Sequence, residues 1–318
     1  MITWVLGRGG LVGSSVEAKL NDRSTVWFPN EPIQWSDLSS FESSFAEAFN
    51  QFVQLIQDED WAILWCAGNG IVSSSTQQLQ SESQYIQVVC SQTELLSQII
   101  QSRGVISFTS SAGGVYGGSS GTIFDENTIP IPINEYGRMK LETERQLTNF
   151  ARISDIKIVI FRLANVYGPN QDVQKSQGII SAITQSVLQH KPIKIYVPLQ
   201  TIRNYIYADD VGEIMARNVT STTKEKKKSV DIKIIASDRN ISLSTLLNEF
   251  RHVYGKRPST INTIGQSMSV QPDNLRLRSI SSSNDRDVFT PLAVGIAKLK
   301  TAYLRSLATT FDRSTLNS

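Results

Sequence analysis

The chain has 318 residues, of which 40% are hydrophobic and 19% are charged, and its net charge is +2. This is the composition of an ordinary globular protein with a sizeable core, and so weak a charge excludes the extended phosphate contacts of a nucleic-acid binder. Two cysteines are too few for a disulfide framework, no apolar run approaches the roughly 18 residues that cross a bilayer, and no side-chain cluster has metal-ligand spacing. We expect a cytoplasmic protein that binds no nucleic acid, membrane or metal.

Short apolar runs alternate with amphipathic segments through the first half of the chain. Runs rich in Val, Ile, Phe and Trp predict strands at residues 2–7, 24–29, 61–68, 104–111 and 156–165. Apolar residues at helical spacing predict helices at residues 11–20, 41–56, 85–100 and 136–150. Strands alternating with helices indicate right-handed crossovers and a parallel sheet covered on both faces. The predicted fold class is therefore α/β, with a doubly wound, Rossmann-type sheet.

The regular alternation of predicted strands and helices weakens after about residue 170. Strand-like runs recur at residues 191–198, 204–210 and 229–237, but the loops between them lengthen. We therefore predict a first domain at residues 1–170 and a smaller, less regular substrate-binding lobe at residues 171–318, closely packed together and with some elements interleaved.

A glycine-rich stretch with Gly7, Gly10 and Gly13 joins the first predicted strand to the first predicted helix. Glycines in this context permit a tight turn, close approach of the backbone to a pyrophosphate, and close packing of helix on strand, while the helix N-terminus supplies N–H donors. The stretch predicts a dinucleotide site in the first domain; the alternative is a glycine-rich turn that binds nothing.

The end of the second predicted strand bears on which dinucleotide binds. It reads Phe28-Pro29-Asn30, without the carboxylate that would accept hydrogen bonds from the adenosine ribose. Arg8, inside the glycine stretch, could instead meet a 2′-phosphate. We therefore predict NADP, with NAD as the alternative if Arg8 packs across the adenine or faces solvent.

A phenol and an ammonium stand four residues apart at Tyr136 and Lys140, on one face of a predicted helix. A neighbouring ammonium stabilises a tyrosinate, so the pair can act as acid and base near neutral pH. The Ser-rich strand end before it offers Ser110 and Ser111, either of which could donate to a substrate oxygen.

These motifs together carry a resemblance. The chain resembles the extended branch of the short-chain dehydrogenase/reductase superfamily, specifically its nucleotide-sugar epimerases, dehydratases and reductases. The matching stretches, in order, are LGRGGLVG, WCAG, SSAGGVYG, DENTIPIPINEYGRMKLETE, FRLANVYGPNQ and RNYIYADDVG, and they span roughly residues 2–215.

The resemblance implies that Ser111, Tyr136 and Lys140 are catalytic. The family usually has its Ser or Thr where Ala112 stands here, so Ser111 fits only with a one-residue shift, and Ser110 is the fallback. The implied cofactor-binding residues are Gly7, Arg8, Gly10, Leu11, Val12, Gly13, Asn30, Asp37, Leu38, Cys66, Ala67, Gly68, Ser110, Tyr136 and Lys140.

The resemblance also assigns a substrate site. Asn165 and Arg203 correspond to residues that hold the diphosphate of a nucleotide sugar, Arg278 is a possible second arginine, and Ser111 would touch the sugar. A guanidinium fork suits phosphate oxygens. The alternative for Arg203 is a structural ion pair with Asp209 or Asp210.

The predicted function is NAD(P)-dependent hydride transfer at a ring carbon of a nucleotide-linked sugar. A reductase of 4-keto sugar nucleotides is slightly preferred, because NADP favours net reduction. One alternative is a 4-epimerase that retains NAD, and another is an inactive NADP(H)-binding sensor or scaffold, suggested by the departure at Ala112. The family resemblance further implies a homodimer.

Overall fold

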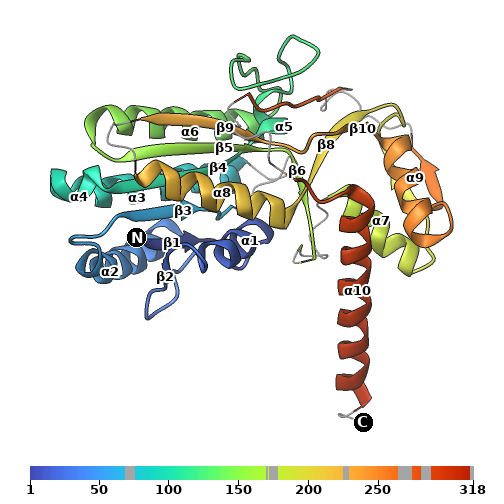
Figure 1. The fold of residues 1–318 in the computed structure, drawn as a ribbon, viewed down its shortest axis with the longest axis horizontal. Helices are drawn as coiled ribbons and strands as arrows, with labels where there is room; N and C mark the ends of the chain where they lie inside the picture. The colour runs from blue at the N-terminus through green and yellow to red at the C-terminus, as the bar shows by residue number, and fades with distance from the viewer. Residues whose placement is uncertain are drawn as a thin grey trace.

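The computed structural model describes residues 1–68, 76–169, 171, 178–224, 229–263, 274–280 and 288–315. Among these residues, the centre of the molecule is a six-stranded sheet in the order β2-β1-β3-β4-β5-β9 (Figure 1). Every neighbouring pair in it is parallel. Its strands are β1 (Ile2–Leu6), β2 (Thr25–Trp27), β3 (Trp61–Trp65), β4 (Gly104–Ser111), β5 (Lys157–Leu163) and β9 (Val230–Ile235). The doubly wound α/β class is confirmed.

Helices cover both faces of this sheet, because side chains along each strand point alternately to the two sides. Trp4 and Leu6 of β1 belong to the core beneath α2 (Leu38–Leu55), α3 (Thr76–Glu94) and α6 (Glu135–Ile153). Val5 belongs to the opposite core, beneath α1 (Leu11–Leu20) and α8 (Ala208–Thr223). Helices α1 and α8 approach so closely that a Cβ on Gly212 would lie 2.4 Å from the Ser15 carbonyl oxygen.

The rest of the chain forms two small sheets and a third apolar core. One sheet has the order β10-β8-β6 and the other pairs β11 with β7. Their strands are β6 (Asn165–Tyr167), β7 (Ile193–Ile195), β8 (Ile202–Tyr207), β10 (Asn240–Ser242) and β11 (Thr260–Asn262), and the helices beside them are α7 (Ile179–Leu188), α9 (Leu243–Tyr254) and α10 (Leu292–Thr315). In Figure 1, α10 extends away from the body of the molecule.

Residues after position 170 also complete the first domain, since β9 closes one edge of the large sheet and α8 covers part of its face. The division into residues 1–170 and 171–318 stays a prediction, and residue 170 itself lies outside the described residues.

Two predicted elements are split in the structure. The strand expected at residues 156–165 ends at Leu163, and Asn165 begins β6, which pairs with β8 of a small sheet. The helix expected at residues 85–100 becomes α3 and a short α4 (Gln98–Ser102), separated at Ser97, whose backbone is extended. The Gln101 side-chain amide donates to the carbonyls of Glu94 and Leu96, which satisfies the interrupted end of α3.

Candidate functional site

The glycine stretch forms a bare cradle between β1 and α1. Gly7 has φ of +85°, and a Cβ there would lie 2.4 Å from the backbone nitrogen of Ala67. A Cβ on Gly13 would lie 2.2 Å from the Gly7 carbonyl oxygen, so both positions require glycine. Gly10 is the N-cap of α1 and provides no side-chain cap, which leaves the first-turn N–H groups directed at the cradle.

Arg8 is already engaged by the protein. Its Nε and Nη2 atoms each donate to the Glu17 carboxylate at 2.8 Å, and its guanidinium carbon lies 3.8 Å from the centre of the Phe28 ring. Both side chains belong to the rim of the cradle, since Glu17 is on α1 and Phe28 follows β2. The positive charge that motivated the NADP prediction is therefore balanced by a carboxylate.

The other predicted cofactor residues lie around this cradle or cap nearby elements. Cys66, Ala67 and Gly68 follow β3, and Ala67 packs directly against Gly7. Burial raises the pKa of the Cys66 thiol to about 12, although the Thr109 hydroxyl hydrogen-bonds to it.

Three further predicted residues lie at or beside α2. Asp37 is the N-cap of this helix and accepts from the Ser40 N–H at 2.9 Å, which lowers the pKa of its carboxyl. Leu38 is the first residue of the helix, and the Asn30 N–H donates to the Gln51 side chain at 3.3 Å. The described contacts of Asp37 are thus local ones, whereas Asn30 ties the end of β2 to the last turns of α2.

Tyr136 and Lys140 lie on the first turns of α6, as the sequence predicts. Asn134 caps the helix by accepting from the Gly137 N–H at 2.8 Å, which fixes where the helix begins. The Lys140 ammonium lies 5.8 Å from the Tyr136 ring centre and donates to the Thr109 carbonyl of β4 at 3.0 Å. The pair therefore sits at the carboxyl end of the central strands, the edge where open α/β sheets bind ligands.

A carboxylate that the sequence analysis did not single out completes this pair. Glu82 of α3 accepts from Lys140 Nζ at 2.6 Å, and both side chains are buried. Burial lowers the pKa of Lys140, but the negative charge of Glu82, with further contributions from Tyr136 and Glu144, outweighs it and raises that pKa above its usual value. Lys140 is thus a charged, internally paired ammonium.

The two candidate serines have different surroundings. Ser110 is buried and donates to Glu144 at 2.6 Å, so its hydroxyl lies in the layer between β4 and α6. Ser111 is half-buried and caps α5 (Ala112–Val115) by accepting from the Gly114 N–H at 3.1 Å. Gly114 in turn lies against Tyr136, because a Cβ there would be 3.1 Å from the ring. The α5 turn therefore brings the Ser111 hydroxyl to the side of the strand end that Tyr136 occupies.

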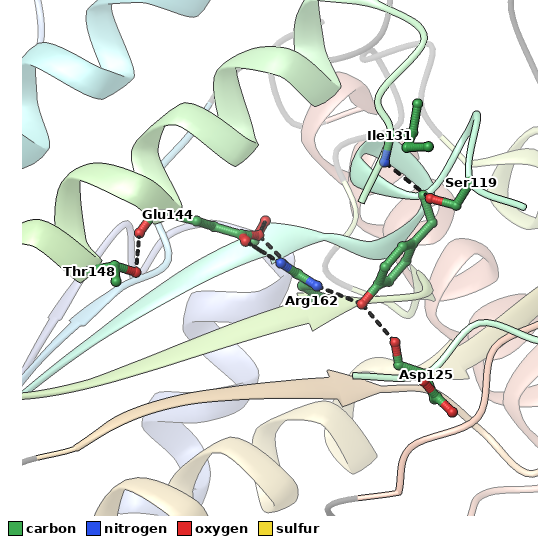
Figure 2. A network of polar contacts seen from close by, with 8 residues as sticks. Ser119, Asp125, Ile131, Glu144, Thr148 and Arg162 are labelled. Carbon is green, nitrogen blue, oxygen red and sulfur yellow. Dashed lines mark hydrogen bonds and ion pairs between the residues drawn. The ribbon is translucent and has the colours of Figure 1, made fainter. Parts of the chain in front are cut away.

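Ser110 belongs to a buried polar network, part of which Figure 2 shows. Arg162 of β5 donates to Glu144 of α6 through Nε and through Nη2, the latter at 2.6 Å. The same guanidinium donates to the Tyr116 hydroxyl, which donates to the Asp125 carbonyl at 3.0 Å. The network ties α6, β5 and the segment after α5 together beneath the Tyr136–Lys140 pair.

Asn165 and Arg203 lie on the sheet formed by β6, β8 and β10. Asn165 pairs in register with Tyr205, two residues from Arg203, so the two side chains leave the same face of this sheet. The Asn165 amide donates to the Asn204 carbonyl at 2.8 Å. Asp210, one of the acids considered as a partner for Arg203, accepts from the backbone and hydroxyl of Thr290, both at 2.8 Å.

Arg278 lines a cavity of about 610 Å³ between α8, the end of β9 and residues 277–279. Arg217 and Lys233 also line this cavity, whereas Asn165 and Arg203 do not. The segment that carries Arg278 is fixed by Glu126, which accepts from Ser279 and Ile280. Leu275 of the same segment donates its N–H to the Ile202 carbonyl of β8, so the segment runs beside the strand that carries Arg203, and a substrate role for Arg278 stays a prediction.

Glu82 and Glu17 are not among the predicted site residues, and the sequence offers a sign of only the first. Glu82 is the sole charged residue between Thr76 and Thr93 of a helix otherwise rich in Gln and Ser, and an isolated charge in such a run invites a search for its partner. For Glu17 the sequence gives no such sign, because the spacing of Arg8 and Glu17 does not predict their ion pair. Among the described residues no group of three or more His, Cys, Asp or Glu side chains could hold a metal ion, and no described helix is long and apolar enough to cross a bilayer.

Comparison with known sequences extends these observations. The model of the NAD dependent epimerase/dehydratase family matches residues 3–232. A putative UDP-glucose 4-epimerase of Methanocaldococcus jannaschii is 29% identical over 158 residues, 49% of each chain. The dTDP-4-dehydro-6-deoxyglucose reductase of Escherichia coli is 30% identical over 152 residues, 48% of this chain and 46% of the relative. The chain thus spans about half the length of these curated relatives.

Solved structures match over nearly the whole chain. The UDP-glucose 4-epimerase of Thermotoga maritima, solved with UDP-glucose, superposes with a TM-score of 0.76 at 21% identity, covering 96% of this chain and 100% of that one. The UDP-glucose 4-epimerase of Thermus thermophilus, solved with NAD, gives 0.78 at 19% identity, covering 96% and 99%. At these identities the likeness is one of fold.

Proposed function

The chain belongs to the NAD dependent epimerase/dehydratase family, and from this membership and the site we propose that it is an enzyme that oxidises and reduces a ring carbon of a nucleotide-linked sugar. The observation that carries the proposal is the Tyr136–Lys140 pair, held at the carboxyl end of β4 beside the glycine cradle. An acid/base group next to a dinucleotide cradle is what hydride transfer to and from a hydroxyl-bearing carbon requires.

The residues of the cradle fit a nicotinamide dinucleotide. Gly7 and Gly13 leave space that any Cβ would fill, and α1 begins without a side-chain cap. We assign the pyrophosphate to the first-turn N–H groups of α1. When bound, the dinucleotide would supply the hydride acceptor and donor.

The protein residues would handle the proton. Tyr136 takes the hydroxyl proton as the ring carbon is oxidised and returns it on reduction, while the Lys140 ammonium stabilises the phenolate. Ser111, which lies near Gly114 and hence near the Tyr136 ring, would donate a hydrogen bond to the same sugar oxygen. Ser110 is less suited to this role because its hydroxyl is buried against Glu144.

We propose NAD as the cofactor, in place of the NADP that the sequence favours. Arg8 uses two donors on Glu17 and stacks on Phe28. A 2′-phosphate would have to displace the Glu17 carboxylate or lie beside it, and two anions repel each other. A ribose hydroxyl meets no such repulsion.

This cofactor choice moves the preference from a reductase to a 4-epimerase. Arg8 would favour NADP, and with it net reduction, only by binding a 2′-phosphate, and the ion pair with Glu17 disfavours this. An epimerase would oxidise the ring carbon, retain the keto sugar and return the hydride to the opposite face. The reductase remains the second candidate, supported by the similarity to the Escherichia coli reductase.

We place the diphosphate of the substrate on the face of the small sheet that carries Asn165 and Arg203. Their shared face, given by the register of β6 and β8, supports this assignment, and an amide and a guanidinium both donate to phosphate oxygens. We make no such assignment for Arg278, which lines a cavity with Arg217 and Lys233 that neither Asn165 nor Arg203 lines.

We also propose a homodimer through the outer surfaces of α3 and α6. An open cavity of about 890 Å³ is lined there by Ser83 and Gln84 of α3, by Ile131, and by Met139 and other residues of α6. Light scattering of the purified protein tests this: a dimer mass is expected, and a monomer mass would contradict it.

Titration of the purified protein with NADH and with NADPH, followed by nicotinamide fluorescence, tests the proposed cofactor. We expect tighter binding of NADH and NAD retained through purification, which would support the epimerase. Preference for NADPH with an empty site would restore the reductase, and binding of neither would contradict the proposed function.

A further inference from the structure

Glu82 occupies an unusual place for a carboxylate. It projects from α3, is 5% exposed, and lies within 2.6 Å of Lys140 Nζ. Its nearest exposed counterpart on the same helix is Glu94, which faces solvent. A carboxylate in such a place is tolerated when a cation pairs with it, so the position of Glu82 is tied to that of Lys140.

Gly68 makes room for this contact. A Cβ on Gly68 would lie 3.3 Å from both carboxylate oxygens of Glu82, so the bare backbone after β3 allows Glu82 to reach Lys140. Gly68 adjoins Ala67, which packs on Gly7 of the cradle. Glu82 therefore links the cradle to the Tyr136–Lys140 pair.

The charges around Lys140 single out Glu82 as its counter-ion. From α6, Tyr136 and Glu144 face the ammonium, but Glu144 already forms a buried ion pair with Arg162 of β5. From β4 come the uncharged Phe108 ring, 4.8 Å away, and the Thr109 carbonyl. From α3 comes Glu82. Among the residues that the structure describes, Glu82 is the anion of this group with no cation beside it other than Lys140.

We propose that Glu82 is a positioning residue of the active site, whose carboxylate holds Lys140 against β4 and keeps it a charged ammonium in a buried place. This role rests on the proposed function, in which the charge of Lys140 assists Tyr136. Without Glu82, burial would favour the neutral amine, and the site would lose the positive charge on which the acidity of Tyr136 depends.

The test is the titration of Lys140 in the protein without added cofactor. Isotope-labelled lysine side chains report their protonation by NMR, and the Lys140→Gln variant identifies the signal. In Glu82→Gln, whose amide oxygen still accepts from Nζ, we expect the midpoint to fall by about two pH units or more. A midpoint within about half a unit of the native one would overturn the proposal, since shifts of that size are ordinary.

Two variants control the measurement. Glu94→Gln removes a carboxylate from the exposed face of α3 and should leave the Lys140 midpoint unchanged. Glu82→Asp keeps the negative charge on a shorter side chain, so its Lys140 midpoint should lie closer to that of the native protein than to that of Glu82→Gln. A Glu82→Asp midpoint as low as that of Glu82→Gln would contradict a role for the charge.

The same pair can be examined from its other partner if Glu82→Gln does not fold. In Lys140→Gln, Glu82 is left without its cation, and its carboxyl should titrate well above the usual value of about 4.3. An ordinary midpoint would overturn the proposal. Neither titration needs cofactor or substrate, so an unshifted midpoint would contradict the role of Glu82 and leave the proposed function untouched. A shifted Lys140 midpoint in a protein that binds no dinucleotide would contradict the proposed function and leave the role of Glu82 untouched.

Discussion

Two buried ion pairs lie one turn apart on α6, and they differ in what surrounds them. Glu144 accepts from Ser110 and from both the Nε and the Nη2 atoms of Arg162. The same guanidinium donates to the Tyr116 hydroxyl, and Figure 2 shows the contact between Glu144 and Arg162. Glu82 accepts from Lys140 alone among the described residues, and Lys140 lies beside the half-buried Tyr136. The Glu144–Arg162 pair thus belongs to a hydrogen-bond network inside the protein, whereas the Glu82–Lys140 pair adjoins the predicted reaction centre at Tyr136.

The difference shows how similar chemistry serves two purposes on one helix. Both pairs have a closest contact of 2.6 Å and both are buried. Arg162 remains charged under all ordinary conditions, which suits a structural tie between α6 and β5. Lysine shifts its pKa readily when buried, so its charge depends on its partner, and that dependence suits a group that tunes a neighbouring phenol.

Breaking the structural pair should produce the largest change in stability. Arg162→Met leaves Glu144 buried without its cation, so the free energy of unfolding should fall by about 3–5 kcal/mol. Denaturant titration measures this. Glu144→Leu combined with Arg162→Met should recover much of the loss, and a single variant as stable as the native protein would show that the network is not structural.

Removing the phenol should produce the largest change in activity with little change in stability. Tyr136→Phe removes the group that carries the proton, so turnover should fall about a thousandfold, while NADH affinity changes little. Steady-state rates and fluorescence titration separate the two effects. Turnover near the native rate would place the chemistry elsewhere.

The two carboxylates should rank in opposite order for stability and for activity. Among the described residues the Glu144 carboxylate accepts four hydrogen bonds and that of Glu82 accepts one, so Glu144→Gln should lose about 1 kcal/mol more stability. Glu82→Gln should instead lose more activity at neutral and alkaline pH. Because the pKa of Lys140 is raised in the folded protein, its stabilising contribution is present at neutral pH and is lost only as pH rises through that raised value. The free energy of unfolding and the turnover rate, each measured against pH for both variants, check these expectations. If the same variant lost more in both measurements, the two carboxylates would not have the separate roles proposed here.

The last prediction concerns the rim of the cradle, where the change affects cofactor choice and not the chemistry. Glu17→Gln frees the charge of Arg8, so the ratio of NADPH to NADH affinity should rise about tenfold, the equivalent of one charged hydrogen bond of roughly 1.5 kcal/mol. Glu42→Gln, on the exposed face of α2, is the matched control. An unchanged ratio would mean that Arg8 does not lie near the adenosine ribose.

The features of the molecule that the sequence predicts are those that depend on residues close together in the chain. The strands, the glycine cradle and the Tyr136 helix follow from short spacing rules, and the cradle and helix lie where those rules place them. Contacts between distant segments have no such pattern: Glu82 meets Lys140 across 58 residues, and Arg278 is placed by the path of residues 274–280. The strand break at Ala164, which sends Asn165 to the small sheet, is a tertiary choice that propensity alone does not reveal.

Conversion of nucleotide sugars tests the central claim most directly. The native protein and Tyr136→Phe would each be mixed with NAD and, in turn, with UDP-glucose, UDP-galactose and dTDP-glucose, and the sugar products separated by chromatography. We expect the native protein to convert at least one sugar into its 4-epimer, or into a keto sugar with an equal amount of reduced nicotinamide, and Tyr136→Phe to convert essentially none. No conversion of any sugar by native protein that holds NAD, or equal conversion by the two proteins, would contradict the assignment of Tyr136 and Lys140 as the reaction centre.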